Sequence, residues 1–144
     1  MNYYFDSSAL IKRFIEEKGS DRVEKLFQKA DNIFTSTVTE IECLSVLKRL
    51  FVDDLITPKD LKTIKNELEL DFNSYKIIPL DLGLKASCRK IIEKYQIRSL
   101  DSIQLASAIR AKNQIDHFVA SDKNLLKVAK MEGFAILDPN QNIS

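Results

Sequence analysis

Short strand-like runs alternate with amphipathic helical patterns along the chain, and this alternation limits the possible folds more than any other feature. The runs lie at residues 3–5, 33–36, 76–79, 118–120 and 134–137. Between them, apolar side chains recur every three or four residues, as in helices that bury one face. Strands that alternate with such helices indicate a mostly parallel sheet covered on both faces. We therefore predict an α/β fold, a three-layer α/β/α sandwich around a mostly parallel central sheet of about five strands.

Helix-start signals support this division of the chain. Thr37 with Glu40 three residues later has the form of a capping box, and Pro58 occupies the first helical position after Thr57. The two helices that begin there are joined by a short link, so we expect an αα-hairpin. Further helix starts are predicted at Ser7, Ser20, Asp81, Ser99 and Lys123. No linker, repeat or low-complexity segment interrupts the chain, and we expect residues 1–144 to form a single domain.

The composition suits a globular protein and excludes several functional classes. Apolar residues make up 44% and charged residues 30% of 144 residues, and the formal net charge is +1. A charge this balanced means that any nucleic-acid-binding surface must be a local patch. Cys43 and Cys88 lie in helical patterns and are expected to be reduced core residues. No apolar run approaches the ~20 residues of a membrane helix, and no signal peptide precedes the first strand. We expect a cytoplasmic protein with no membrane partner.

Four acidic residues stand at comparable junctions between predicted strands and helices. Asp6 ends the first strand, Asp122 follows the fourth, Asp101 lies in the first turn of its helix, and Glu42 lies about one turn into the long helix. Each has a simple structural explanation when it is taken alone. Asp6 and Asp122 can cap helices, Asp101 suits a helix amino terminus and has Arg98 nearby, and Glu42 can be a solvated surface residue.

Taken together, the four carboxylates suggest a shared site. In a parallel sheet the strand ends that lead into helices lie along one edge, where α/β proteins bind their ligands. Carboxylates gathered there repel one another unless protons or cations offset their charge. Hard oxygen ligands with open positions suit Mg²⁺ or Mn²⁺. We therefore expect the four acids to meet around a divalent cation.

Four segments of the chain resemble the PIN domain family, and more narrowly the VapC-type toxin ribonucleases. In chain order they read Y-F-D-S-S-A-L-I-K-R-F-I-E-E-K-G-S, T-S-T-V-T-E-I-E, R-S-L-D-S-I-Q-L-A-S-A-I and F-V-A-S-D-K-N-L. They carry the four acids in the family's order and span nearly the whole chain. The second segment selects Glu42, not Glu40, as the metal-site residue. Gln104 stands where many relatives have histidine, a departure that we do not expect to abolish metal binding.

The resemblance implies metal-dependent hydrolysis of RNA phosphodiester bonds, which leaves a 5′-phosphate and a 3′-hydroxyl. Asp6 and Asp101 are then the first choices as ligands of Mg²⁺ or Mn²⁺, and Glu42 and Asp122 complete the site directly or through water. Residues expected to orient an acid or to contact substrate are Ser7, Ser121 and Arg98. The resemblance also implies a type II toxin–antitoxin system, with RNA as substrate, a cognate antitoxin docked across the site, and a homodimer.

Other interpretations remain open at this point. A catalytically inactive PIN-like module that binds RNA or protein is the main alternative, although a complete set of acids argues against it. Haloacid-dehalogenase-like phosphatases use Asp-x-Asp after strand one, and here Ser8 occupies the second position. Receiver domains need a pair of adjacent acids there, and only Asp6 is present. Cations near the acids in sequence are candidates for binding substrate phosphate, although a solvated helix face explains any one of them more simply: Lys12, Arg13, Arg49, Arg98 and Lys123.

Overall fold

The computed structural model describes residues 1–141, and its centre is a five-stranded sheet. The strand order is β3-β2-β1-β4-β5, and every neighbouring pair is parallel. The expectation of a mostly parallel sheet of about five strands is therefore confirmed. The strands are β1 (Asn2–Phe5), β2 (Asn32–Ser36), β3 (Lys76–Ile78), β4 (His117–Val119) and β5 (Ile136–Leu137).

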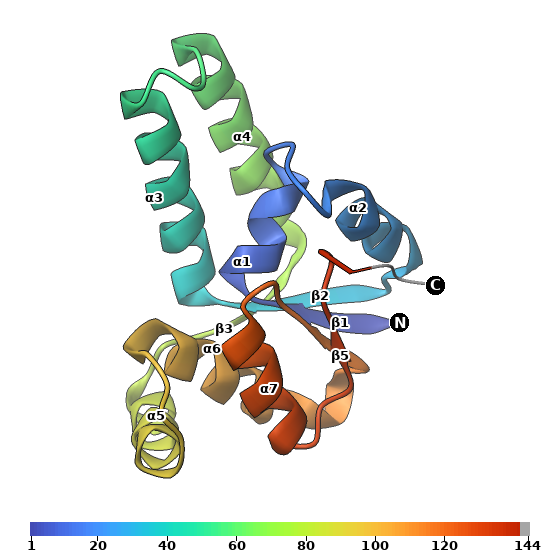
Figure 1. Ribbon diagram of the computed structural model, residues 1–144, viewed down its shortest axis with the longest axis vertical. Helices are drawn as coiled ribbons and strands as arrows, with labels where there is room; N and C mark the ends of the chain where they lie inside the picture. Colours follow the sequence, from blue (N-terminus) through green and yellow to red (C-terminus); the bar gives the residue numbers. More distant parts are fainter. Residues whose placement is uncertain (142–144) are drawn as a thin grey trace.

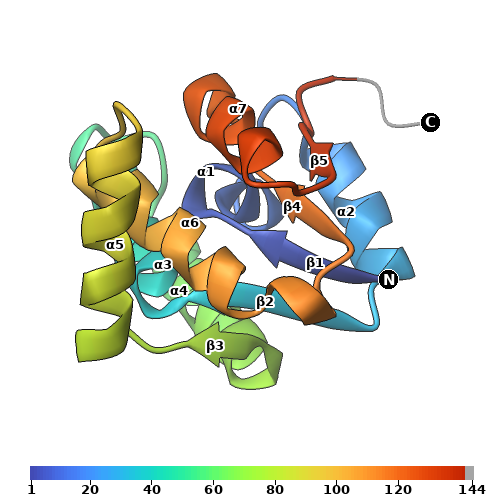
Figure 2. The same cartoon turned by 90° about the horizontal axis from the view of Figure 1, so that it is seen from below.

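Helices cover both faces of the sheet, which gives the predicted three layers (Figure 1). The first face carries α1 (Ser7–Leu10), the 3₁₀ turn η1 (Ile11–Arg13), α2 (Ser20–Lys29), α3 (Thr37–Val52) and α4 (Pro58–Ser74). The second face, which is nearer the viewer in Figure 2, carries α5 (Leu82–Lys94), α6 (Ser99–Arg110) and α7 (Lys123–Met131). A second 3₁₀ turn, η2 (Lys112–Gln114), leads into β4. Helices α3 and α4 run side by side as the expected αα-hairpin.

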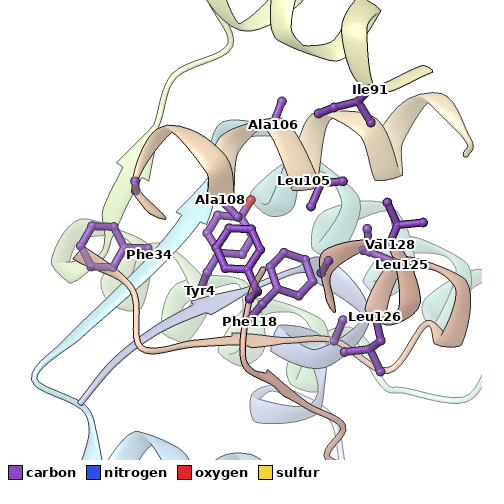
Figure 3. Close-up of a cluster of buried hydrophobic side chains, with 14 of the residues drawn as sticks. Tyr4, Phe34, Ile91, Leu105, Ala106, Ala108, Phe118, Leu125, Leu126 and Val128 are labelled. Carbon is purple, nitrogen blue, oxygen red and sulfur yellow. The ribbon is translucent and has the colours of Figure 1, made fainter. Parts of the chain in front are cut away.

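The aromatic run of β1 supplies both cores because successive side chains of a strand point to opposite faces. Tyr3 and Phe5 pack into the cluster beneath α1 to α4, whereas Tyr4 packs into the cluster beneath α5 to α7. Figure 3 shows the second cluster, where the Tyr4 and Phe118 rings stack with their centroids 5.3 Å apart. Burial of one such ring stabilises the fold by about 1.5–3 kcal/mol. The central strand is thus fixed from both sides, and with it the position of the residue that follows it.

Some predicted helix ends were wrong by one residue. Ser36, and not Thr37, caps α3, because its backbone is extended and its side chain accepts a hydrogen bond from the Val38 N–H. The Thr37 hydroxyl instead donates to the carbonyl of Ile78 on the neighbouring strand. Helix α6 begins after Arg98, which makes no side-chain capping bond, so Ser99 is not its cap.

Two helix caps and the burial of both cysteines are as expected from the sequence. Thr57 and Asp60 form a reciprocal capping box at the start of α4, and Asp81 caps α5. Cys43 and Cys88 are buried free thiols. Within the described residues 1–141, no helix has both the length and the apolar character needed to cross a bilayer. The predicted domain extends to residue 144, and residues 142–144 lie outside the described part.

Candidate active site

The strand order places a switch point between β1 and β4. From β1 the chain passes outward through β2 to β3, and it then returns to lay β4 on the other side of β1. The carboxyl ends of two such strands frame a crevice in which α/β proteins bind ligands. Asp6 directly follows β1, and Asp122 follows β4 by three residues. The Asp6 N–H donates to the Val119 carbonyl at 3.1 Å, so the two strands are still paired where the acids begin.

Asp6 is a buried carboxyl, with 2% of its surface exposed. It caps α1 by accepting from the Ala9 N–H at 3.1 Å, and the Ser8 hydroxyl lies 2.8 Å from each of its carboxylate oxygens. The pKa of Asp6 is raised to about 7, mainly by burial and to a lesser extent by the charge of Glu42, against the lowering effect of the Ser8 and Ala9 hydrogen bonds. Across residues 1–141, no lysine or arginine forms an ion pair with this carboxyl.

Glu42, on the first turns of α3, is held by neutral donors. The Ser7 hydroxyl donates to its Oε2 at 2.9 Å, and the Gln104 amide donates to its Oε1 at 3.1 Å. The same Gln104 amide nitrogen donates to the Thr39 hydroxyl at 2.9 Å, and its carbonyl oxygen accepts from the Tyr4 hydroxyl at 2.7 Å. The side chains of Tyr4, Thr39 and Gln104 are buried, and their hydrogen bonds fix the direction in which Gln104 presents its N–H to Glu42.

Asp101 and Asp122 form a second pair, and Arg98 bridges them. The arginine Nε donates to Asp101 Oδ2 at 3.1 Å, and its Nη2 donates to Asp122 Oδ2 at 2.8 Å. Burial raises the pKa of Asp101, as does the charge of Asp122, whereas the bond from Arg98 lowers it. Asp122 also caps α7 by accepting from the Leu125 N–H. The structural explanation is therefore correct for Asp6, Asp101 and Asp122, whereas Glu42 is half-buried and hydrogen-bonded, not a solvated surface residue.

The two pairs are neighbours along the same sheet edge. The Ser8 hydroxyl, which contacts Asp6, accepts from the N–H of Ser121, the residue before Asp122. The Ser121 hydroxyl oxygen is buried and has no hydrogen-bond partner within residues 1–141. Leu100, beside Asp101, lines the same hollow of about 450 Å³ as Ser7, Ser8 and Glu42. As the side chains stand, no three His, Cys, Asp or Glu residues of the described chain are placed to hold one metal ion.

The family model of the PIN domain matches residues 3–131, which is most of the chain. This chain belongs to the PIN domain family. Its matched segment begins in β1 and ends at the last residue of α7, so it contains all four acids. No curated protein is a detectable relative at the level of sequence.

Solved structures with the same fold include toxin–antitoxin proteins. FitAcB from Neisseria gonorrhoeae has a TM-score of 0.71 at 16% identity, covering 95% of this chain and 97% of that one. VapBC2 from Rickettsia felis, bound to a fragment of promoter DNA, has a TM-score of 0.66 at 13% identity, with 96% and 98% covered. VapC20 from Mycobacterium tuberculosis, described as a sarcin-ricin loop cleaving toxin, has a TM-score of 0.66 at 13% identity, with 92% and 96% covered. At such low identity these similarities establish the fold alone.

The side chains of this PIN domain site suit a divalent cation in their chemistry. The available donors are carboxylate and hydroxyl oxygens, which Mg²⁺ and Mn²⁺ prefer. Asp6 is buried beside Glu42 with no cation partner in the described chain, an arrangement that a bound cation would stabilise. Ser121, whose buried hydroxyl has no partner within residues 1–141, contacts Ser8 through its backbone N–H and precedes Asp122. These residues therefore fit the ion, although the side chains must rearrange before three of them reach it.

Two of the five cations considered from sequence lie away from the acids and are already paired. Lys12 is buried and contacts Glu17 at 2.9 Å, and Arg13 contacts Asp71 on α4 at 2.6 Å. Arg49 lines the hollow beside Glu42. Arg98 instead forms ion pairs with Asp101 and Asp122. Lys123 is the exposed first residue of α7.

Sequence reasoning assigned no site role to Ser8 or to Gln104, yet each touches an acid of this site. Ser8 was considered only because it occupies the place of a second aspartate. Gln104 was considered only as a departure from histidine. A usable signal was nevertheless present for Gln104, because it lies one turn after Asp101 and is a large polar residue in the stretch that continues Leu105-Ala106. A buried amide needs partners, and it finds them in Glu42 and its neighbours.

Proposed function

We propose that this PIN domain is a metal-dependent endoribonuclease and the toxin of a type II toxin–antitoxin pair. The observation that carries the proposal is the position of Asp6. It is a buried carboxyl beside Glu42 at the β1/β4 switch point, without a cation partner in residues 1–141, and with the Asp101–Asp122 pair adjacent. Folding alone gives no reason to bury Asp6 beside a second acid, because burial and the neighbouring negative charge both penalise its ionised form. We propose further that residues 1–144 form one such domain.

In this proposal Asp6 and Asp101 are the first choices as ligands of Mg²⁺ or Mn²⁺, and Glu42 and Asp122 bind directly or through water. The ion would make a nucleophile from water at neutral pH and would stabilise the charge that develops on the scissile phosphate. Ser8 and the Ala9 N–H hold Asp6 in one orientation, whereas Ser7 and Gln104 hold Glu42.

RNA as substrate is supported by the cations around the acids and by one neighbour in fold. Arg49, Lys123 and Lys127 are exposed, and within residues 1–141 none of them forms an ion pair. Their charges are therefore available to phosphates close to the acids. VapC20, which shares the fold, is described as a sarcin-ricin loop cleaving toxin.

An antitoxin partner is supported by the toxin–antitoxin assemblies among the neighbours and by exposed apolar surface beside the site. The hollow next to Glu42 has Ile41 and Leu100 on its rim, 63% and 49% exposed. A partner segment seated there would cover both residues and close access to the acids. A homodimer belongs to the same proposal.

The test is an RNA cleavage assay with and without Mn²⁺ or Mg²⁺, in which the wild type is compared with Asp6→Asn and Asp101→Asn. Both variants should lose cleavage, and chelation should abolish it in the wild type. Asp81→Asn is the matched control, because Asp81 also caps a helix and pairs with an arginine but lies on α5 away from the acids. Retained cleavage in both site variants would refute the assignment. RNA binding with no cleavage by the wild type would favour the inactive binding module.

A further inference from the structure

Arg98 occupies two of the acids that the proposed function assigns to the metal. It precedes α6 in extended backbone, and its side chain reaches Asp101 on its own helix and Asp122 at the cap of α7. The arginine side chain is 78% exposed, whereas Asp101 and Asp122 are 13% and 23% exposed. The guanidinium therefore lies on the outside of the pair, between the two carboxylates and solvent.

The shape of the guanidinium explains why one side chain serves both acids. Its Nε and Nη2 point to different carboxylates, one from each of two helices, at 3.1 and 2.8 Å. A planar fork of donors can do this, and a single ammonium cannot do it equally well. The arginine is thus the counter-charge that favours the proximity of Asp101 and Asp122.

The same arginine also lines a second hollow of about 730 Å³, formed by the end of α5, the link to α6 and one side of α7. Its charged and polar lining includes Lys94, Lys127 and Asn124, and its only acids within the described chain are Asp101 and Asp122. While Arg98 is bound to these two acids, its charge is not available to the hollow. Lys94 is paired with Glu132 at 3.3 Å, so if a cation neutralises the acids, Arg98 and Lys127 make the lining positive and suited to a phosphate.

We propose that Arg98 exchanges partners. It neutralises Asp101 and Asp122 in the metal-free protein, a divalent cation displaces it from these carboxylates, and the released guanidinium binds a phosphate of RNA lying in the second hollow. This inference rests on the proposed function. The exchange needs no unpacking of the core, because the arginine side chain is mostly exposed, and an ion pair with one partner in solvent is weak enough to give way to a metal.

The exchange can be distinguished from a purely supporting role of Arg98, because the two give opposite changes in metal affinity when Arg98 is removed. If Arg98 served to hold the carboxylates ready for the ion, its removal would weaken metal binding. In the exchange, removal of Arg98 deletes a competitor and leaves two acids repelling each other, so metal binding tightens. RNA binding weakens at the same time, because a phosphate contact is lost. The two affinities therefore move in opposite directions.

The experiment titrates the purified full-length chain with Mn²⁺ alone by isothermal titration calorimetry and separately measures KM for RNA cleavage. Arg98→Ala should tighten Mn²⁺ binding by roughly three- to tenfold, the scale of two exposed ion pairs, and should raise KM by a similar factor. Arg98→Lys should lie between the wild type and Arg98→Ala. Arg89→Ala is the control, because Arg89 forms an exposed ion pair with Glu93 on α5 and should leave both quantities unchanged.

Each outcome supports or overturns the exchange. Unchanged or weaker Mn²⁺ binding in Arg98→Ala overturns it, as does an equal change in Arg89→Ala, which would indicate a general effect of net charge. Tighter Mn²⁺ binding with an unchanged KM overturns the transfer to RNA. Should the wild type cleave no RNA, the proposed function fails, whereas the Mn²⁺ titration still decides whether Arg98 competes with a cation.

Discussion

Asp6→Asn should make the metal-free protein more stable at alkaline pH, although Asp6 is the centre of the proposed site. Burial raises the pKa of Asp6 from 3.8 to about 7, so the folded state resists ionisation that the unfolded state accepts. The ionised carboxyl therefore destabilises the fold progressively as the pH rises from 3.8 to 7, and the cost is constant above that range. About three pH units at 1.36 kcal/mol each amount to about 4 kcal/mol. Asparagine removes this cost and is an equally good helix cap.

The assay is thermal unfolding of the wild type and Asp6→Asn in a chelating buffer at pH 4 and pH 8. At pH 8 the variant should unfold roughly 8–16 °C above the wild type, at ~2–4 °C per kcal/mol for a chain of this size. At pH 4 the two melting temperatures should nearly coincide, because both carry an uncharged side chain at this position. Mn²⁺ added at pH 8 should raise the melting temperature of the wild type more than that of the variant.

Asp81→Asn provides a control of opposite sign. The bond from Arg110 holds the pKa of Asp81 at about 2, so this carboxylate stabilises the fold above its ordinary pKa and loses that effect as the pH falls toward 2. Asp81→Asn should therefore lower the melting temperature at pH 8, where Asp6→Asn raises it. The reasoning is refuted if Asp6→Asn is no more stable than the wild type at pH 8, or if its advantage is the same at both pH values.

Two further predictions concern Gln104, which holds Glu42, and Gly19, which precedes α2. Gln104→Leu leaves the buried Tyr4 hydroxyl and Glu42 without their amide partner and should cost about 1–3 kcal/mol in urea unfolding, with slower RNA cleavage. Gln104→His supplies a ring N–H in place of the amide and should recover most of that cleavage. Equal cleavage rates for Gln104→Leu and Gln104→His would contradict the role of the donor at this position. Gly19→Ala should cost more than about 1 kcal/mol, because φ is +91° and a Cβ would lie 2.7 Å from the Pro139 carbonyl oxygen; an unchanged urea midpoint would contradict this.

The layers and the sheet could be predicted because they follow from local patterns. The aromatic run of β1 and the period of the helices fix which side chains are buried, and the strand ends follow from the point where polar residues begin. Helix caps were less predictable. Ser36 and Thr37 are both good caps in sequence, and the choice between them depends on the hydrogen bond from Thr37 to Ile78 on another strand, which local sequence does not contain.

The partners of the acids were harder to predict than their positions. Their places at strand ends and helix starts follow from the topology of a parallel sheet. The bridge from Arg98 to Asp122 depends on how α6 and α7 lie relative to each other, across 24 residues of sequence. The hydrogen bond from the Gln104 amide to Glu42 depends on how α6 and α3 lie relative to each other, across 62 residues of sequence. Distances of this kind are set by packing, so sequence could indicate a shared edge but not which acids would pair.

The contrast between the two pairs of acids is the strongest physical argument that this edge has a function. Asp101 and Asp122 share a cationic partner, the exposed Arg98, which accounts for their position in the fold. Asp6 and Glu42 have no such partner, because the groups that contact them in the described chain are hydroxyls and N–H groups, and ionisation of Asp6 is therefore unfavourable. A chain with 22 basic and 21 acidic residues has ample cations to place there, and replacing Asp6 by a neutral cap would make the metal-free fold more stable. A carboxyl that destabilises the fold at neutral pH is explained if it binds a cation from solution. The pH dependence of the melting-temperature difference between Asp6→Asn and the wild type measures this destabilisation directly.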